Sequence, residues 1–267
     1  GRGPANPLKK EVVQDFMYQL CLGCAHIHRH GVMHRDLKPQ NLLVDKAKNV
    51  IKVADLGLGR AFSVPVKSYT HEIVTLWYRA PELLLGARHY TRAVDIWAAG
   101  CIFAELTTLV VPFKGVPKGK EDPKSMYQAE QIESIAAAKG APSEDEWPLF
   151  REHPDYERAK KIFYPPSHPE GRPINDKAPI RKDPELSAVF DELCAYDPEK
   201  RPTAYEALTT LDYFATTEPG PTKNIFDYEL APGEQRIVYP HRKILHGTGD
   251  CKPPDDEAPK KRHKTSS

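Results

Sequence analysis

The stretch that decides the fold is His34-Arg35-Asp36-Leu37-Lys38-Pro39-Gln40-Asn41. It is followed by Asp55-Leu56-Gly57 and then by Ala80-Pro81-Glu82. The asparagine lies five positions after Asp36, and the second aspartate lies 19 positions after it (55 − 36). This spacing suits a loop, a short hairpin and a turn. We therefore expect Asp36, Asn41 and Asp55 to meet at one site, and favour this over ordinary polar loop residues.

Length and composition indicate one globular domain with a tail. The chain has 267 residues, 40% of them hydrophobic, and a formal net charge of +1, so nothing in the charge balance points to nucleic acid. Five scattered cysteines without the spacing of a disulfide framework favour a reducing compartment. The longest apolar stretch, residues 96–104, is too short to span a membrane. We expect neither nucleic acid nor a membrane as a partner.

Hydrophobic periodicity predicts a mainly helical chain. A helix is expected over residues 8–30, a short strand over 49–54, and a strongly apolar, buried helix over 95–106 with Asp95 placed to cap its start. Further helices are predicted over residues 124–139, 184–193 and 203–211. Because 21 of the 26 prolines lie at or beyond Pro112, long irregular connections should separate the later helices.

Residues 8–214 resemble the large helical lobe of a eukaryotic protein kinase, and specifically of the cyclin-dependent kinases. The sharpest sign is Tyr69-Thr70-His71-Glu72-Ile73-Val74-Thr75-Leu76-Trp77-Tyr78-Arg79-Ala80-Pro81-Glu82. The lysine two positions after Asp36 makes this motif resemble that of serine/threonine kinases rather than that of tyrosine kinases. The resemblance implies a mainly α, protein kinase-like fold with short β-hairpins over residues 1–214. A Pro-rich extension follows over residues 215–267, with a basic tail expected to be disordered from about residue 252.

The resemblance also implies roles for the polar motifs. In this family Asp36 accepts the proton of the substrate hydroxyl, Lys38 adds positive charge near the transferring phosphate, and Thr75 bridges the two. Asn41 and Asp55 hold two Mg²⁺ ions, because hard cations prefer carboxylate and amide oxygens. The implied activity is phosphate transfer from ATP to serine or threonine.

The nucleotide site is only partly represented in the motifs. By resemblance, Gln40 lies near the ribose and Leu43 forms the floor under adenine. A kinase also needs a glycine-rich loop, a strand lysine and a helix glutamate, which we do not expect within the 35 residues before Asp36. We therefore predict that the small β-rich N-terminal lobe is absent and that the chain is an N-truncated fragment, inactive alone. The alternative is a scaffold that binds substrates or partners without phosphotransfer.

The activation segment implies regulation and substrate choice. Thr70 occupies the position that an upstream kinase phosphorylates in this family, and Arg35 and Arg60 match two of the arginines that bind the phosphate. A solvated loop hydroxyl is the alternative for Thr70. Val74 and Arg79 resemble the pocket that accepts proline after the target residue, because proline has no amide hydrogen to leave unsatisfied. Substrates with Ser/Thr-Pro sites are therefore expected.

Other residues are predicted to support the fold. By resemblance, Glu82 pairs with Arg201 in the interior and Asp95 braces the catalytic loop. The stretch Cys21-Leu22-Gly23-Cys24-Ala25-His26-Ile27-His28-Arg29-His30 suggests zinc at first sight. On a helix, however, the histidines point in diverging directions, so core cysteines and solvated histidines are the better interpretation.

Partners and location follow from the same resemblance. A cyclin is expected as a partner, although its main contact surface belongs to the lobe predicted to be absent. Residues 83–91, 113–131 and 219–243 resemble the Mediator-associated, cyclin-C-dependent kinases, whereas Thr70 and Asp55-Leu56-Gly57 resemble cell-cycle members. Both assignments stay open, and a Mediator-type complex is a further expected partner. Pro259-Lys260-Lys261-Arg262-His263-Lys264 is typical of a nuclear-localisation cluster or of a solubilising end.

Overall fold

The protein is described by a computed structural model over residues 8–45, 50–56, 60–61, 76–116 and 128–214. The α-helices are α1 (Lys10–Arg29), α3 (Pro81–Leu84), α4 (Ala93–Thr108), α5 (Ala129–Lys139), α6 (Tyr156–Phe163), α7 (Pro184–Leu193) and α8 (Ala204–Thr210). Short 3-10 helices are η1 (Pro39–Asn41), η3 (Pro148–Glu152), η4 (Pro179–Lys182), η5 (Pro198–Lys200) and η6 (Asp212–Phe214). The strands are β1 (Val32–Met33), β2 (Leu42–Asp45), β3 (Val50–Val53) and β4 (Arg60–Ala61).

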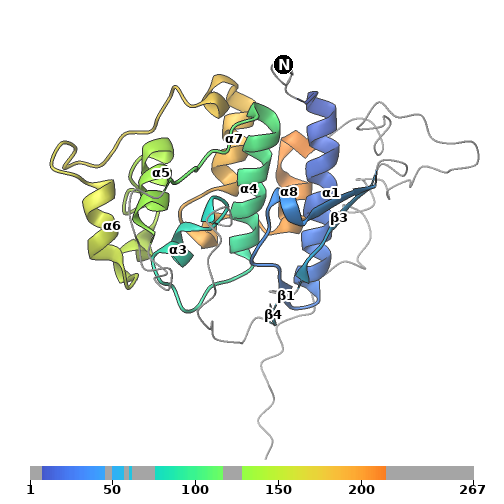
Figure 1. Ribbon diagram of the computed structural model, residues 1–267, viewed down its shortest axis with the longest axis horizontal. Coiled ribbons are helices and arrows are strands. Elements are labelled where there is room, and N and C mark those ends of the chain that lie inside the picture. The colour runs from blue at the N-terminus through green and yellow to red at the C-terminus, as the bar shows by residue number, and fades with distance from the viewer. Residues whose placement is uncertain (1–7, 46–49, 57–59, 62–75, 117–127, 215–267) are drawn as a thin grey trace, which may run out of the picture.

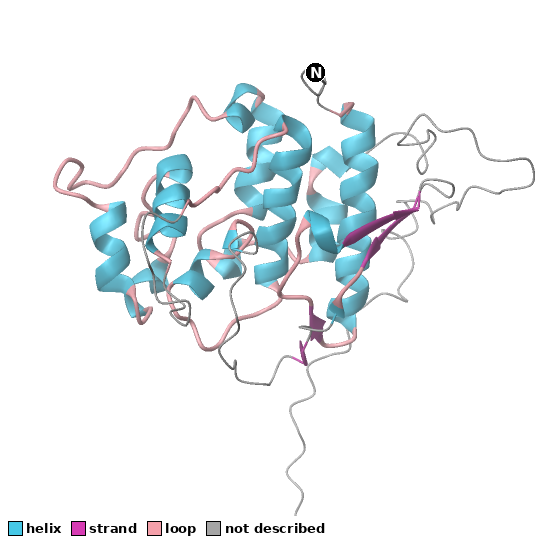
Figure 2. Cartoon of the chain, viewed as in Figure 1, coloured by secondary structure: helices cyan, strands magenta, loops and turns pink. Residues whose placement is uncertain are grey.

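The helices are arranged around α4 (Figure 1). α1 packs against both α4 and α8, and α7 packs against α4. α5 and α6 contact each other on one side of this group, while the β2–β3 hairpin lies against α1 on the other (Figures 1 and 2). Among the described residues, no helix combines the length and apolar character needed to cross a membrane.

α1 forms because apolar residues recur on one of its faces. Val13, Met17, Leu20 and Cys24 follow one another at intervals of three or four residues, and each is at most 1% exposed. The helix ends just before Gly31, whose φ of 72° is in the left-handed region that a β-carbon disfavours. The helix predicted over residues 8–30 is therefore found two residues shorter at its start and one shorter at its end.

α4 is the buried central helix, and all its side chains from Ala93 to Ala104 are buried. The prediction that Asp95 caps its start is wrong. The helix begins at Ala93, Arg92 occupies the N-cap position, and Asp95 lies in the first turn. The physical reason is that the Asp95 carboxylate is already engaged by main-chain N–H groups of residues 34 and 35.

The later helices begin at side-chain caps. The Asp183 carboxylate accepts a hydrogen bond from the N–H of Glu185 at 2.9 Å, and Pro184 occupies the first helical position of α7. At α8, Thr203 Oγ1 accepts from the N–H of Glu206 at 3.1 Å while the Glu206 carboxylate accepts from the N–H of Thr203 at 2.7 Å. The helix predicted over residues 184–193 has the observed bounds, and the one over 203–211 is found at 204–210.

The four strands form two antiparallel pairs. β1 pairs with β4, with Val32 opposite Ala61, and β2 pairs with β3, with Leu42 opposite Val53. These strands lie in the amino-terminal part of the chain, where the sequence predicted that a small β-rich lobe is absent. That prediction needs correction, because strands are present in this part of the chain, and the strand predicted over residues 49–54 is found as β3 at residues 50–53. Residues 124–127 of the helix predicted over residues 124–139 and the tail over residues 215–267 lie outside the described residues.

Asp191 on α7 ties three segments together. Its carboxylate accepts hydrogen bonds from Lys139 Nζ at the end of α5 and from Arg181 Nη2 in η4, each at 2.9 Å. Burial alone would raise the pKa of Asp191, but the hydrogen bonds from Arg181 and the charge of Lys139 outweigh it. The pKa of Asp191 therefore lies below its ordinary value.

We expect the Asp191→Asn variant to be less stable than the wild type at neutral pH and equally stable in acid. A carboxyl group with a lowered folded-state pKa stabilises the fold above its unfolded pKa of about 3.9, and the contribution is lost as the pH falls through the folded pKa. Because the Asp191 side chain is 43% exposed, solvent screening limits the effect to about 1 kcal/mol. Urea unfolding at about pH 7 and about pH 2.5 measures it. A difference that does not change with pH would contradict this account.

Candidate active site

The main chain of the loop that carries Asp36 is hydrogen-bonded to Asp95 of α4. The carboxylate of Asp95, which is 1% exposed, accepts hydrogen bonds from the N–H of His34 at 2.8 Å and of Arg35 at 2.7 Å. His28 Nε2 donates to the same carboxylate at 2.8 Å. Arg35 has a φ of 71°, a conformation that costs about 1 to 3 kcal/mol in a non-glycine residue. The bonds to Asp95 supply the restraint that keeps the loop in this shape.

The Asp36 carboxylate is positioned by two neighbours in its own loop. Lys38 Nζ lies 2.8 Å from Asp36 Oδ2. Asn41 Nδ2 donates to the main-chain oxygen of Asp36 at 2.7 Å and to Oδ2 at 3.2 Å. Asp36 is 9% exposed, and among the described residues its Oδ1 has no hydrogen-bond partner. This oxygen is therefore a free acceptor held in a fixed place, which a buried group in a folded protein rarely is.

His34 connects this loop to the turn that carries Asp55. Its Nε2 lies 2.8 Å from the carbonyl oxygen of Ala54, and its Nδ1 lies 3.3 Å from the main-chain nitrogen of Asp36. A carbonyl oxygen only accepts, so Nε2 carries the hydrogen and Nδ1 accepts from the N–H of Asp36. The side chain is fully buried. One neutral imidazole thus joins the residue at Asp36 to the residue that precedes Asp55.

Asn41 and Asp55 have the chemistry of a magnesium site. The main-chain N–H of Ala54 donates to the main-chain oxygen of Asn41 at 2.8 Å, which brings the two segments together. The amide nitrogen of Asn41 is used by Asp36, so its oxygen is the group left for a cation. Asp55 is exposed and has a φ of 60°. An amide oxygen and a carboxylate on adjacent segments fit Mg²⁺, and these two residues would hold it.

The two residues predicted at the nucleotide lie at the open side of the loop. Gln40 is exposed in η1, and Leu43 is 58% exposed on β2 opposite Lys52 of β3. Leu43 is among the most exposed large apolar side chains of the described chain. An exposed leucine at this position is suited to contact an apolar ring, although a single exposed leucine is also common on protein surfaces.

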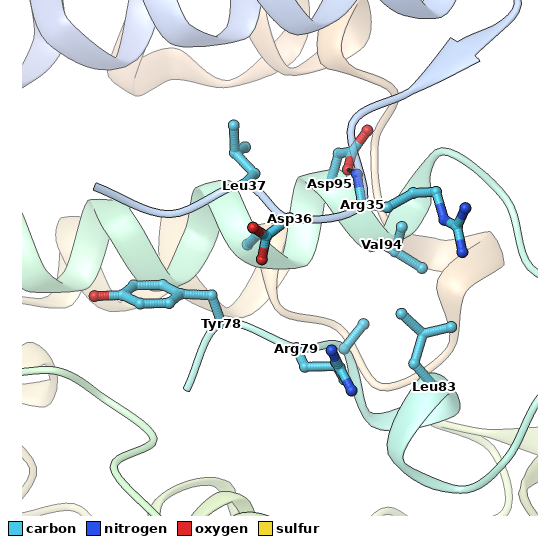
Figure 3. Close-up of a pocket in the computed structure, with 10 residues that line it drawn as sticks. Arg35, Asp36, Leu37, Tyr78, Arg79, Leu83, Val94 and Asp95 are labelled. Atoms are coloured by element: carbon cyan, nitrogen blue, oxygen red, sulfur yellow. Dashed lines mark hydrogen bonds between the residues drawn. The ribbon is translucent and has the colours of Figure 1, made fainter. Parts of the chain in front are cut away.

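The segment over residues 76–80 lines the other side of the site (Figure 3). Tyr78 Oη donates to Glu105 Oε2 of α4 at 2.6 Å, and burial together with this bond raises the pKa of Tyr78. Arg79 is half-buried, and its burial lowers the pKa of the guanidinium while the charge of Asp36 opposes that shift. In Figure 3 the Asp36 carboxylate points toward the segment that carries Tyr78 and Arg79. An anionic and a cationic side chain thus line one small pocket.

Glu82 and Arg201 form a bidentate ion pair in the interior. Arg201 Nη1 lies 2.7 Å from Glu82 Oε1, and Nη2 lies 2.8 Å from Oε2. Arg201 is 5% exposed and Glu82 is 2% exposed. Arg201 also donates to three main-chain oxygens and lies over the ring of Trp97, 5.1 Å from its centre. The pair fixes α3 to η5 directly behind the segment that lines the pocket.

Some predicted site residues are not placed by the structure. Thr70, Val74 and Thr75 lie outside the described residues. The main chain of Arg60 pairs with Met33 through β4 and β1, and its side chain is outside the described part. The predicted contacts of these residues therefore stay predictions.

The prediction that all three histidines at the end of α1 are solvated is wrong for His28. His26 and His30 are exposed, but His28 is 5% exposed and donates to Asp95. The position could have been recognised, because His28 follows the buried Cys24 by one helical turn and so falls on the buried face. Burial also raises the pKa of Cys21 to about 12, so this thiol is protonated and poorly suited to zinc. Within the described ranges, no three His, Cys, Asp or Glu side chains converge.

The loop, the turn that carries Asp55 and the ion pair lie within residues 34–201, and a family comparison covers this whole region. The model of the protein kinase domain matches residues 4–214. The chain belongs to the protein kinase family. This match also contradicts the prediction of an absent small lobe, because it begins at residue 4 and includes α1 and the strands β1 to β3. The predicted inactivity of the chain alone rested on that absence and falls with it.

The chain is also similar to individual serine/threonine and cyclin-dependent kinases. The chain is 39% identical over 255 residues to the serine/threonine-protein kinase SSN3 of Mycosarcoma maydis, covering 92% of this chain and 34% of that protein. It is 45% identical over 208 residues to the cyclin-dependent kinase B1-1 of Arabidopsis thaliana, covering 78% and 62%. It is 43% identical over 219 residues to the cell division control protein 2 homolog C of Antirrhinum majus, covering 81% and 65%. The predicted resemblance to cyclin-dependent kinases is confirmed. The chain spans between about a third and two thirds of the length of these relatives.

Proposed function

We propose that the protein transfers the γ-phosphate of ATP to serine or threonine hydroxyls of protein substrates. The observation that carries this proposal is the Asp36 carboxylate, which is buried, held by Lys38 and Asn41, and left with one unpartnered oxygen among the described residues. A substrate hydroxyl that donates to this oxygen is oriented for attack and can release its proton to it. Nothing else in the described loop offers a carboxylate in that position.

The neighbouring residues support the same reaction. Lys38 holds the Asp36 carboxylate in place and brings a positive charge beside the acceptor hydroxyl. Asn41 and Asp55 would hold Mg²⁺, which when bound neutralises the negative charge on the phosphate oxygens. Gln40 and Leu43 lie on the open side where a nucleotide would approach. In this proposal the protein positions the reactants and stabilises the charge on the phosphate, and it takes little part in covalent chemistry.

The proposed substrates carry proline directly after the target residue. Arg79 and Asp36 line the same pocket, which supports a peptide that lies over residues 76–80 with its hydroxyl at Asp36. Val74 and Arg79 are the residues assigned by resemblance to the proline pocket. An amide hydrogen left unpaired there would cost about 1 to 3 kcal/mol, and proline has none.

The test compares matched peptides that differ only in the residue after the target serine. We expect the purified protein with Mg²⁺ and ATP to phosphorylate a Ser-Pro peptide with a kcat/KM about tenfold or more above that of the Ser-Ala peptide. Equal rates for the two peptides would refute the proline preference. Peptide binding without phosphate transfer would instead favour the scaffold alternative.

Regulation and partners are proposed from the resemblance. Phosphorylation of Thr70 by an upstream kinase would add nearly two negative charges that Arg35 and Arg60 can bind. The main chain of Arg35 is fixed by Asp95, so one of these arginines starts from a defined position. A cyclin, a Mediator-type complex and a nuclear location are proposed on the same basis, with the basic cluster at residues 259–264 as the localisation signal. Replacing Thr70 with alanine should leave activity insensitive to the upstream kinase.

A further inference from the structure

Gln131 on α5 forms hydrogen bonds to the main chain of the loop over residues 113–115. This loop in turn contacts the segment over residues 76–80, which lies at the pocket. Gln131 Nε2 donates to the carbonyl oxygen of Phe113 at 2.9 Å, and its Oε1 accepts from the N–H of Gly115 at 3.1 Å. Gln131 is 2% exposed, so both bonds lie in the interior. The side-chain amide thus pairs with the main chain as a neighbouring strand would, and it fixes residues 113–115 in one register.

The same loop is hydrogen-bonded to Trp77. The indole Nε1 of Trp77 donates to the carbonyl oxygen of Gly115 at 3.0 Å, and Lys114 Nζ lies 5.0 Å from the centre of the Trp77 ring. Gly115 leaves no space for a larger residue, because a β-carbon there would lie 2.7 Å from the Cα of Gln131. Gln131, Gly115 and Trp77 therefore form one continuous chain of contacts, which we call the Gln131 clamp.

The clamp is anchored in the core at its far end. Phe113 is fully buried and its ring stacks on Trp97 with the ring centres 5.2 Å apart. Trp97 also carries the guanidinium of Arg201, the partner of Glu82. Because the core side of the loop is fixed in this way, Gln131 and Trp77 transmit a defined position and do not merely follow a flexible loop.

We propose that the Gln131 clamp positions the segment that receives the substrate peptide, and that Gln131 and Trp77 are positioning residues for peptide binding. Trp77 lies two residues before Arg79, which lines the same pocket as Asp36. Tyr78 is tied to α4 through Glu105, so the clamp supplies the second anchor of this short stretch. Loss of the clamp frees one side of the stretch and moves the surface on which a peptide lies. The inference rests on the proposed function only in placing the peptide on residues 76–80.

The experiment measures the clamp directly and without catalysis. In Gln131→Met, which keeps the side-chain volume and removes both hydrogen bonds, amide hydrogen exchange in residues 76–80 should be at least about fivefold faster than in the wild type. Trp77→Phe removes the indole donor while keeping an aromatic ring, and it should act in the same direction. The Kd of a fluorescein-labelled Ser-Pro peptide, read by anisotropy, should rise about five- to tenfold in both variants.

The matched control is Gln14→Met. Gln14 Nε2 also donates to a main-chain oxygen, that of Tyr213 at 2.7 Å, but it joins α1 to η6. This variant should leave both exchange in residues 76–80 and the peptide Kd at wild-type values. Unchanged exchange in Gln131→Met and Trp77→Phe would overturn the clamp, and faster exchange with an unchanged Kd would overturn its role in peptide binding. A wild type that binds the peptide but transfers no phosphate would refute the proposed function alone, since exchange and Kd still decide the clamp.

Discussion

Replacing Asp36 by asparagine should lower the rate of peptide phosphorylation by a factor of about 10² to 10⁴, the usual contribution of a positioned general base. The amide has nearly the shape of the carboxylate, but it carries no charge and is a far weaker proton acceptor. The oxygen lost is the one without a partner among the described residues, and Lys38, 2.8 Å from the other oxygen, would lose its counter-charge. Initial rates at saturating ATP and peptide measure the effect.

The Asp36 result needs a control for folding. The Asn41 bond to the main-chain oxygen of residue 36 does not depend on the carboxylate, so the urea midpoint of Asp36→Asn should stay close to that of the wild type. Asp212→Asn makes the same chemical change at an exposed position in η6 and should leave the rate unchanged. A folded Asp36→Asn protein that retains wild-type activity would exclude Asp36 as the base.

Replacing Arg201 by methionine should produce the largest loss of stability among the variants considered. The change removes both bonds to Glu82 and leaves a carboxylate that is 2% exposed without its partner. Breaking a buried pair from one side typically costs about 3 to 5 kcal/mol, because the remaining charge has neither water nor a counter-charge. Equilibrium unfolding in urea gives the free-energy difference.

Two further variants separate the buried charge from lost packing. The double variant Glu82→Met with Arg201→Met removes both charges and should recover much of the stability lost in the single variant. Arg158→Met removes a pair with Asp155 in which the arginine side chain is 58% exposed, and it should change stability by less than about 1 kcal/mol. If Arg201→Met were no more destabilising than Arg158→Met, the buried pair would not be a main support of the fold.

The helices could be predicted where apolar periodicity and end signals agree. α7 was found at the predicted residues 184–193, since Asp183 and Pro184 mark its start and buried residues recur within it. α6 was not predicted because it has only eight residues, so the four-residue spacing of its buried Ala159 and Phe163 is too short a pattern to be recognised in the sequence. Its formation depends on packing against α5, a contact that the sequence does not encode locally.

The site could be predicted as residue types but not as geometry. The octapeptide and Asp55 indicated the residue types of the candidate site, whereas the left-handed conformations of Arg35 and Asp55 leave no trace in residues that are not glycine. Asp95 was expected both to cap α4 and to brace the loop, and the structure gives its carboxylate only to the loop and His28. Gln131 escaped notice because a lone glutamine carries no motif, and its partners are main-chain groups 16 and 18 residues away.

Transfer of labelled phosphate from ATP to a Ser-Pro peptide by the purified protein, measured with Mg²⁺ and with EDTA, decides whether the Asp36 loop is a phosphotransfer site. We expect phosphoserine on the peptide with Mg²⁺ and none with EDTA, since Asn41 and Asp55 are assigned to the metal. A folded protein that yields no phosphopeptide with Mg²⁺, or the same amount in EDTA, would contradict the assignment of the Asp36 loop as a phosphotransfer site.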